Sequence, residues 1–173
     1  PLLDIDLGAA ILGDILISGN SYVGAQAWSS SSEGGAYVYM NTQGNIDVLD
    51  ESGITVMEAC GTAAMSLLAG ADITIDGTSS LYASSNDSIS TILAFAGGNL
   101  NALGPVDVFN NDGAALAALL AMGDLTVKNS TAMSIASGGP DALQDLEDMI
   151  NELLGGDDPT QCITIDRQHA YSG

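Results

Sequence analysis

Basic residues are almost absent from this sequence of 173 residues. Lys128 and Arg167 stand against 22 Asp and Glu residues, which gives a formal net charge of −20 at pH 7. Nucleic acids and anionic membranes attract proteins through Lys and Arg, so the charge argues against both as partners. It argues equally against enzymes that hold phosphate or acidic sugars with cationic side chains.

Catalytic and membrane motifs are missing as well. The sequence has no Gly-x-Ser-x-Gly elbow, no Walker loop and no Rossmann fingerprint, and its single histidine, His169, lies near the C-terminus. No run of about 18 apolar residues occurs, as a membrane-spanning helix would require. We therefore predict a protein that is not an enzyme and does not insert into membranes. Glycoside hydrolysis by a carboxylate pair stays open, because 22 acids guarantee chance pairs.

Aromatic residues make up only 5% of the chain, whereas hydrophobic residues reach 46% and are evenly spread. An even apolar content of this size supports a packed protein rather than a disordered one. The length predicts a single domain over residues 1–173.

A five-residue pattern recurs along the chain: a small residue, Asp or Asn, an aliphatic residue, any residue and usually a second aliphatic residue. Its central copies begin about 27 residues apart, a period typical of solenoids. The copies are Gly13–Ile17, Gly44–Val48, Ala71–Ile75, Gly98–Ala102 and Gly123–Val127, while Cys162–Asp166 keeps the strand without the leading pair.

Two further short alternating runs follow most copies of the pattern. One set comprises residues 22–25, 54–58, 81–84, 106–109 and 133–136, and the other comprises residues 36–40, 64–69, 92–96 and 117–121. Three short strands and three corners per unit predict an all-β fold, a parallel β-helix of about six coils stacked about 4.8 Å apart. Abundant Ala, Gly and Ser suit the narrow interior of such a solenoid.

Two segments have helical features. Residues 114–122 are rich in Ala and Leu and have high helix propensity, but their place in the repeat predicts a strand. Pro140 suits a first helical turn and Gly155 a C-terminal cap, so we predict an inserted amphipathic helix over residues 140–155. It would pack on the flank of the solenoid or at a junction between subunits. Its apolar residues have helical spacing: Leu143, Leu146, Met149, Ile150 and Leu153.

The two cysteines, Cys60 and Cys162, fall in the second and sixth predicted coils. Four steps of about 4.8 Å separate them by roughly 19 Å along the axis, whereas a disulfide needs Cα atoms within about 7 Å. Two alternatives remain: a pair of buried free thiols, or a bond between neighbouring molecules.

Metal-binding motifs are absent from the sequence. Neither zinc-ligand spacing nor an EF-hand loop occurs, so we predict no cofactor. A divalent cation such as calcium would suit the acidic turns chemically, with Asp112, Asp157 and Asp158 as loose candidates. The alternative is that these acids are simply solvated corner residues.

The ends of the predicted solenoid carry the functional hint. A terminal coil exposes strand edges that monomeric proteins cover or blunt. We expect Leu3, Ile5 and Leu7 at one end, and Ile163 and Ile165 at the other, to form complementary edges between copies. Such head-to-tail contacts yield a filament or a ring, and salt should favour them because the copies repel each other. A piece cut from a longer repeat protein would show the same open edges.

The coils, as in Gly44–Val48 and Ala71–Ile75, resemble the right-handed β-helices of secreted bacterial adhesins of the filamentous-haemagglutinin type, over roughly residues 13–137. The acidic, Gly/Ala/Ser-rich composition with two cysteines resembles the sheath proteins of methanogenic archaea. That second resemblance implies subunits stacked into hoops or tubes, with Cys60 and Cys162 in intermolecular disulfides. Both imply an extracellular protein at the cell surface, where sequons at Asn86 and Asn129 would permit glycosylation.

We therefore expect a structural extracellular protein whose partner is itself, polymerised end to end into a fibre, hoop or sheath. The alternative is a monomeric surface adhesin or carbohydrate-binding β-helix. In that case Trp28, Tyr37 and Tyr39 would offer an aromatic platform to a polysaccharide.

Overall fold

A computed structural model of the chain describes residues 2–128, with side chains from residue 12 onward. These residues form strands and turns and contain no helix. The strands are β1 (Leu2–Ile11), β2 (Ile15–Ile17), β3 (Tyr22–Ala27), β4 (Gly35–Thr42), β5 (Ile46–Val48), β6 (Gly53–Glu58), β7 (Thr62–Ala69), β8 (Ile73–Ile75), β9 (Ser80–Ser85), β10 (Ile89–Ala96), β11 (Leu100–Ala102), β12 (Val106–Asn110), β13 (Ala114–Ala121) and β14 (Leu125–Val127).

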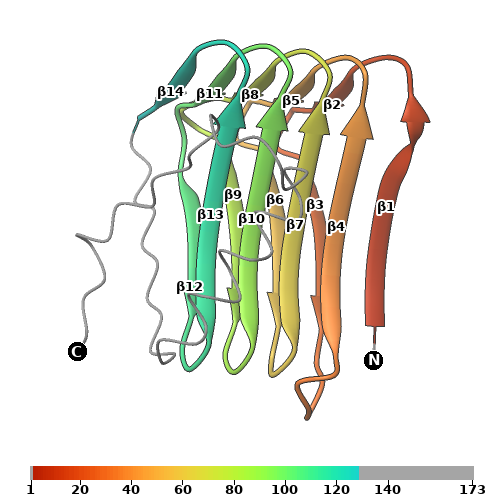
Figure 1. Cartoon of the computed structure of the whole chain (residues 1–173), viewed down its shortest axis with the longest axis vertical. Helices are drawn as coiled ribbons and strands as arrows, with labels where there is room; N and C mark the ends of the chain where they lie inside the picture. Colours follow the sequence, from red (N-terminus) through yellow and green to blue (C-terminus); the bar gives the residue numbers. More distant parts are fainter. Residues whose placement is uncertain (1, 129–173) are drawn as a thin grey trace, which may run out of the picture.

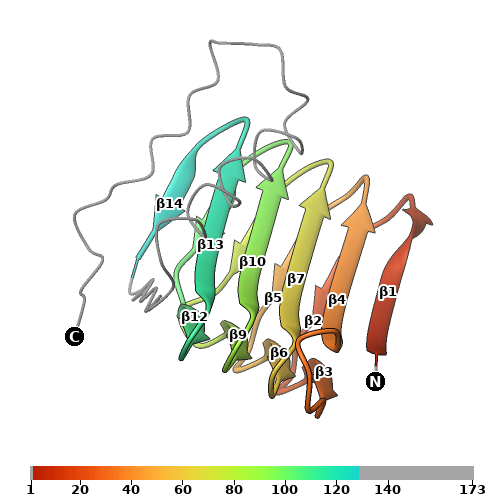
Figure 2. The same cartoon turned by 60° about the horizontal axis from the view of Figure 1, so that its bottom comes forward.

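The chain winds through three parallel sheets in turn, so that every third strand is a neighbour (Figures 1 and 2). Sheet A has the order β1-β4-β7-β10-β13, sheet B has β14-β11-β8-β5-β2, and sheet C has β12-β9-β6-β3. Four turns are complete, and β13 and β14 begin the next. This arrangement confirms the predicted all-β parallel solenoid with three strands per coil.

The repeat length follows from the strand register. Ile46 pairs with Ile73 and Gly35 with Thr62, which are both steps of 27 residues. The first unit is longer because seven residues, rather than three, connect β3 to β4. Residues 114–121 form strand β13, as their position in the repeat predicts and despite their helix propensity. The predicted strands at 133–136 and 162–166 and the predicted helix at 140–155 lie outside the described residues.

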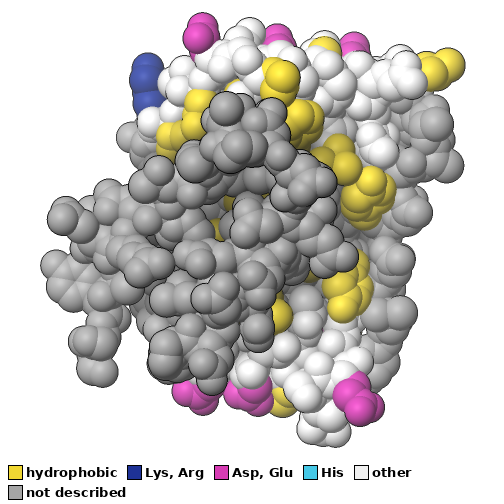
Figure 3. Space-filling model, in the orientation of Figure 1, with side chains coloured by type: hydrophobic (Ala, Val, Ile, Leu, Met, Phe, Trp, Pro, Cys, Tyr) yellow, Lys and Arg dark blue, Asp and Glu magenta, His cyan; other side chains and the backbone are white. Residues whose placement is uncertain are grey.

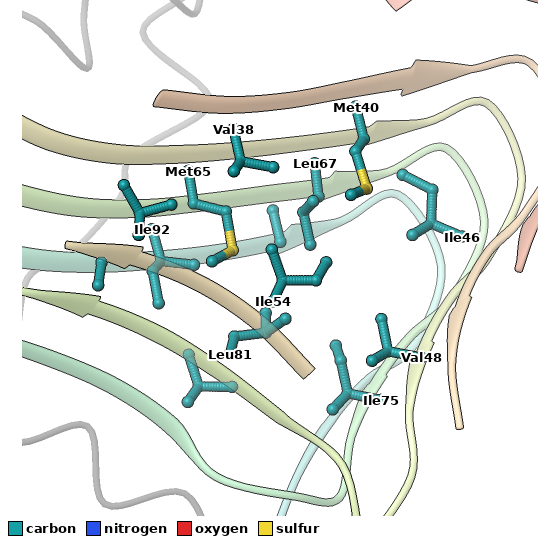
Figure 4. Packing of buried hydrophobic residues seen from close by; sticks show 14 of the residues in the cluster. Val38, Met40, Ile46, Val48, Ile54, Met65, Leu67, Ile75, Leu81 and Ile92 are labelled. Carbon is teal, nitrogen blue, oxygen red and sulfur yellow. The ribbon is translucent and has the colours of Figure 1, made fainter. Parts of the chain in front are cut away.

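The core consists of inward-pointing residues of β2 to β13, stacked in columns along the axis (Figure 4). Strand β7 alternates regularly, with Met65 and Leu67 fully buried and their neighbours partly exposed. Register places Met65 between Val38 and Ile92, so similar aliphatic side chains lie directly above one another. Such like-on-like columns of aliphatic residues fill a narrow interior without aromatic rings.

Candidate functional site: the ends of the solenoid

A ladder of Asp and Asn side chains joins the coils at the corner between sheets A and B. In each coil the side-chain oxygen accepts the backbone N–H of the equivalent residue in the next coil. The four bonds run from Asn45 N–H to Asp14 Oδ1 (2.8 Å), from Asp72 N–H to Asn45 Oδ1 (3.0 Å), from Asn99 N–H to Asp72 Oδ1 (2.6 Å) and from Asp124 N–H to Asn99 Oδ1 (2.9 Å). This ladder gives the second position of the recurring pattern its physical meaning, because only a short side chain with an acceptor oxygen makes this bond.

Within the described part of the chain, β2 is the edge strand at the N-terminal end of sheet B. Ile15 donates its N–H to Asn45 O (2.8 Å), and Ile17 O accepts the N–H of Leu49 (2.9 Å). Because alternate residues of a parallel strand bond to opposite neighbours, the N–H and C=O of Leu16 face away from β5. Leu16 therefore offers one donor and one acceptor to a further strand.

Among the described residues, β14 is the last strand at the other end of sheet B, and its free backbone groups complement those of β2. Leu100 donates its N–H to Asp124 O (2.9 Å), and Ala102 O accepts the N–H of Lys128 (2.8 Å). The same alternation turns the backbone groups of Leu125 and Val127 away from β11. These groups are placed to bond to the backbone of Leu16 in another copy. Within the solenoid, Ile46 and Val48 of β5 occupy the equivalent positions and bond to the next strand of sheet B in this way.

No strand of residues 2–128 covers the core at the edge formed by β14. Leu125 and Val127 are 50% and 46% exposed, although the register pairs them with Leu100 and Ala102, which are fully buried. In the inner coils these positions face the interior. A further strand on β14 would bury the two side chains, which gives the edge a hydrophobic reason to be paired.

Large exposed apolar side chains gather at the two ends. Those of the first coil are Leu12, Leu16, Tyr22 and Trp28, and those of the last are Met122, Leu125 and Val127. Among the described residues, the middle coils contribute only Ile89, at 38% exposure. Concentrated exposed apolar surface is typical of an interaction site.

Strand β1 forms the edge of sheet A at the N-terminal end. The predicted edge residues Leu3, Ile5 and Leu7 pair in register with Ala36, Val38 and Met40 of β4. The register shifts between Leu7 and Ile11, and such a bulge hinders further pairing at an edge. The regular stretch that remains available is therefore Leu2–Leu7. Ile163 and Ile165 lie outside the described residues.

Glu58 is a buried carboxylate that sequence reasoning overlooked. It occupies an inward position of β6 after Ile54 and Val56, and it is only 5% exposed. Its Oε1 accepts hydrogen bonds from the Ser29 N–H (2.9 Å) and hydroxyl (2.7 Å). Its Oε2 is buried and has no hydrogen-bond partner among the described residues. A charged residue in the inward phase of an alternating strand was the available signal.

The pKa of Glu58 reflects two opposing effects. Burial raises it, but the hydrogen bonds from Ser29 and from the backbone of Cys60 and Gly61 outweigh burial. The pKa of Glu58 therefore lies below its usual range. These bonds tie the long loop after β3 to the next coil, so the carboxylate has a structural role.

Cys60 is a partly exposed free thiol in the turn between β6 and β7. A hydrogen bond with Asp87, partial burial and the charges of Asp87 and Glu58 raise its pKa. Oxidation proceeds through the thiolate, so this environment slows disulfide formation at neutral pH. Cys162 lies outside the described residues, and the predicted separation of the two cysteines stays a prediction.

The candidate metal and glycosylation positions lie on turns. Asp112 is exposed between β12 and β13, where its N–H donates to Asn86 O (2.7 Å). Within residues 2–128 no group of three His, Cys, Asp or Glu side chains could hold a metal ion. Asn86 is exposed in the turn between β9 and β10. Asp157, Asp158 and Asn129 lie outside the described residues.

The structure separates the three aromatic residues proposed as a sugar platform. Trp28 is 71% exposed and follows β3 of sheet C, whereas Tyr37 and Tyr39 lie on β4 of sheet A. The two tyrosines are partly buried, and the Tyr39 hydroxyl accepts a hydrogen bond from Asn41 Nδ2 (3.3 Å). One flat platform of all three is therefore not formed.

Comparisons with known proteins yield no relative. No protein-family model matches the chain, and no match is found among the curated proteins or the solved structures. In the part of the chain that the structure describes, no helix is long and apolar enough to cross a membrane.

Proposed function

We propose that the protein is a structural subunit that polymerises end to end into an extracellular fibre, hoop or sheath. The observation that carries the proposal is the match between the two edges of sheet B. The outward backbone groups lie on Leu16 at one edge and on Leu125 and Val127 at the other. They have the same register as the groups that hydrogen-bond neighbouring inner coils. Pairing β2 of one copy with β14 of the next would continue the sheet across the junction and bury Leu125 and Val127.

This geometry refines the predicted complementary ends. Leu3, Ile5 and Leu7 belong to sheet A, whereas the described copies of the five-residue pattern form strands of sheet B. Residues 162–166 continue that pattern, so their partner in a neighbouring copy would be β2 rather than β1. If residues 162–166 pair with β14 of their own chain, they compete with β2 of the neighbouring copy for that edge.

Proline at position 16 tests the junction. Leu16→Pro removes the outward N–H of β2 without removing a bond to β5, and Pro is tolerated at such an edge. We expect this variant to fold as the parent does but to remain unassembled in sedimentation velocity experiments. Leu16→Ala, which keeps the N–H, is the matched control and should still assemble.

A second proline identifies the C-terminal partner. Ile163→Pro should leave polymers intact if β14 pairs directly with β2 of the next copy. Loss of assembly in Ile163→Pro would assign the edge to residues 162–166 instead. Polymers in both Leu16→Pro and Ile163→Pro would contradict end-to-end pairing through sheet B.

A further inference from the structure

The outer face of sheet A is uncharged and largely apolar from β4 to β13. At its N-terminal edge, the register pairs Asp4 and Asp6 of β1 with Tyr37 and Tyr39. Three rows of outward residues on this face are partly exposed in every strand from β4 to β13. The rows are Tyr37, Ala64, Thr91 and Leu116; Tyr39, Ser66, Leu93 and Ala118; and Asn41, Leu68, Phe95 and Leu120. This is unusual for a chain with 22 acids, and such faces mark contact sites.

In each of the other two sheets the outward residues of β2 to β14 include an acid. The outward row of sheet B runs through Leu16, Asp47, Thr74, Asn101 and Thr126. Sheet C includes Asp107 and Gln26 among its outward residues. Figure 3 shows sheet A toward the viewer, with acidic side chains at the upper and lower rims of the coloured surface and hydrophobic side chains between them. Since all 14 described strands belong to the three sheets, none of them packs on this face.

The chain itself contains a segment of complementary pattern. At 100° per residue, Leu143, Leu146, Met149, Ile150 and Leu153 fall on one side of the helix predicted over residues 140–155. Four of the segment's five acids, Asp141, Asp145, Asp148 and Glu152, fall on the other side, and Glu147 lies at the border next to Leu143. Such a helix needs an uncharged apolar surface for one side and water for the other.

We propose that residues 140–155 dock as a helix on the outer face of sheet A of their own chain. A 16-residue helix is about 24 Å long, and an eight-residue parallel strand of sheet A is about 26 Å long, so the face accommodates it. Residues 129–139 connect it to the end of the described chain. These 11 residues can span up to about 36 Å, which is enough to pass from sheet B to sheet A.

Two arguments favour this segment over a second copy as the occupant. A tethered segment has an effective concentration in the millimolar range, which a separate molecule does not reach. A second copy would also bring a net charge of −20 toward an equally charged molecule, whereas the segment turns four of its five acids away from the face. The docking is independent of pairing between the ends, because it uses neither β2 nor β14.

Crosslinking in the full chain tests the proposal. In a Cys60→Ser, Cys162→Ser background, Ser66→Cys places a thiol on sheet A and Met149→Cys places one on the apolar side of the segment. Ser84→Cys, on the outer face of sheet C in the same coil, replaces Ser66→Cys in the control. Both replace a serine by its closest structural analogue. A short bismaleimide is applied to a mixture of ¹⁴N- and ¹⁵N-labelled protein, and links are read by mass spectrometry.

The expected result is a link between positions 66 and 149 within one chain, without mixed isotopes, at least about fivefold above the control. Equal yields from positions 66 and 84 would overturn the docking. Links of mixed isotopic composition at position 66 would also overturn it and would assign the face to a second copy. Circular dichroism verifies that each variant keeps the β structure of the parent.

Discussion

At the scale of single residues, Asp and Asn alternate along the ladder between sheets A and B. Asp14, Asp72 and Asp124 are separated by Asn45 and Asn99, so consecutive carboxylates lie two coils apart. Two coils correspond to about 10 Å, close to the Debye length at 0.1 M salt. The alternation therefore keeps an acceptor in every coil while only three of the five ladder residues carry a charge.

Removing one acceptor from the ladder should destabilise the solenoid. Asp72→Ala leaves the Asn99 N–H without its 2.6 Å partner, and we expect a loss of about 1–3 kcal/mol in the free energy of unfolding. Asp72→Asn keeps an acceptor of the kind found at Asn45 and should change stability by less than about 0.5 kcal/mol. Urea unfolding measures both, and equal effects would contradict the role given to the ladder.

Acid should unfold the protein partly through Asp76. Partial burial raises the pKa of this carboxyl, but hydrogen bonds from Asp50, Thr78 and Ser79 outweigh it and lower the pKa to about 2. Because the folded pKa lies below the unfolded value, the stabilisation is complete above about pH 4. It is lost as the pH falls toward 2. Glu58, whose pKa is also lowered, acts in the same direction.

Asp76→Asn tests this dependence, because the amide does not titrate. Its free energy of unfolding should fall less steeply between pH 4 and pH 2 than that of the parent. Parallel curves for the two proteins would show that Asp76 does not contribute. Direct NMR titration of the Asp76 carboxyl should give a pKa near 2.

At the scale of elements, the sequence pattern predicts the strands well because every coil repeats the same alternation of inward and outward residues. Two aliphatic residues flanking an outward one identify each strand of sheet B, as in Ile73–Ile75. The pattern outweighs propensity at Ala114–Ala121, whose Ala and Leu residues favour a helix in isolation. Tertiary pairing with β10 decides the conformation there.

The corners and the ends are less predictable from sequence. The ladder depends on which residues stack, and stacking appears only once the register is known. The bulge between Leu7 and Ile11 and the extra residues before β4 leave no periodic signal. The sequence marks Glu58 as a charged residue at an inward strand position. It does not identify the hydrogen-bond partner, because Ser29 lies in the irregular loop before β4.

Glycines at the corner between sheets C and A allow the coils to approach. A Cβ on Gly61 would lie 2.0 Å from Gly34 O and 2.4 Å from Gly34 C, so the backbone would have to shift. We expect Gly61→Ala to cost about 1–3 kcal/mol in thermal or urea unfolding. Gly77→Ala is the control, because its Cβ would have a single neighbour at 3.9 Å. Equal stability of the two variants would show that the coils are not closely packed at this corner.

At the scale of the whole molecule, the net negative charge of each copy opposes the proposed assembly. The acidic residues at the two ends add a local repulsion. In the described residues the ladder runs from Asp14 to Asp124, so a junction of β2 with β14 would place Asp14 of one copy next to Asp124 of another. Like charges at such a contact destabilise it and make it dependent on salt. Salt or divalent cations should therefore promote assembly.

Asp124→Asn should strengthen the junction. The amide oxygen still accepts a backbone N–H, and one of two adjacent carboxylates is removed. We expect a critical concentration lower by about two- to fivefold in sedimentation experiments at low salt. Asp72→Asn removes the same charge from an inner coil and should leave the critical concentration unchanged. A similar effect of both variants would indicate a response to net charge alone.

Electron microscopy of the full-length protein at raised salt tests the central claim most directly. End-to-end pairing predicts filaments or tubes whose strands stack about 4.8 Å apart along the axis, with one subunit every 24–29 Å or so, the length of about five to six coils. These should be absent from Leu16→Pro and present in Leu16→Ala. Discrete particles the size of one chain, or filaments without the 4.8 Å axial spacing, would contradict the assembly of this solenoid through its ends.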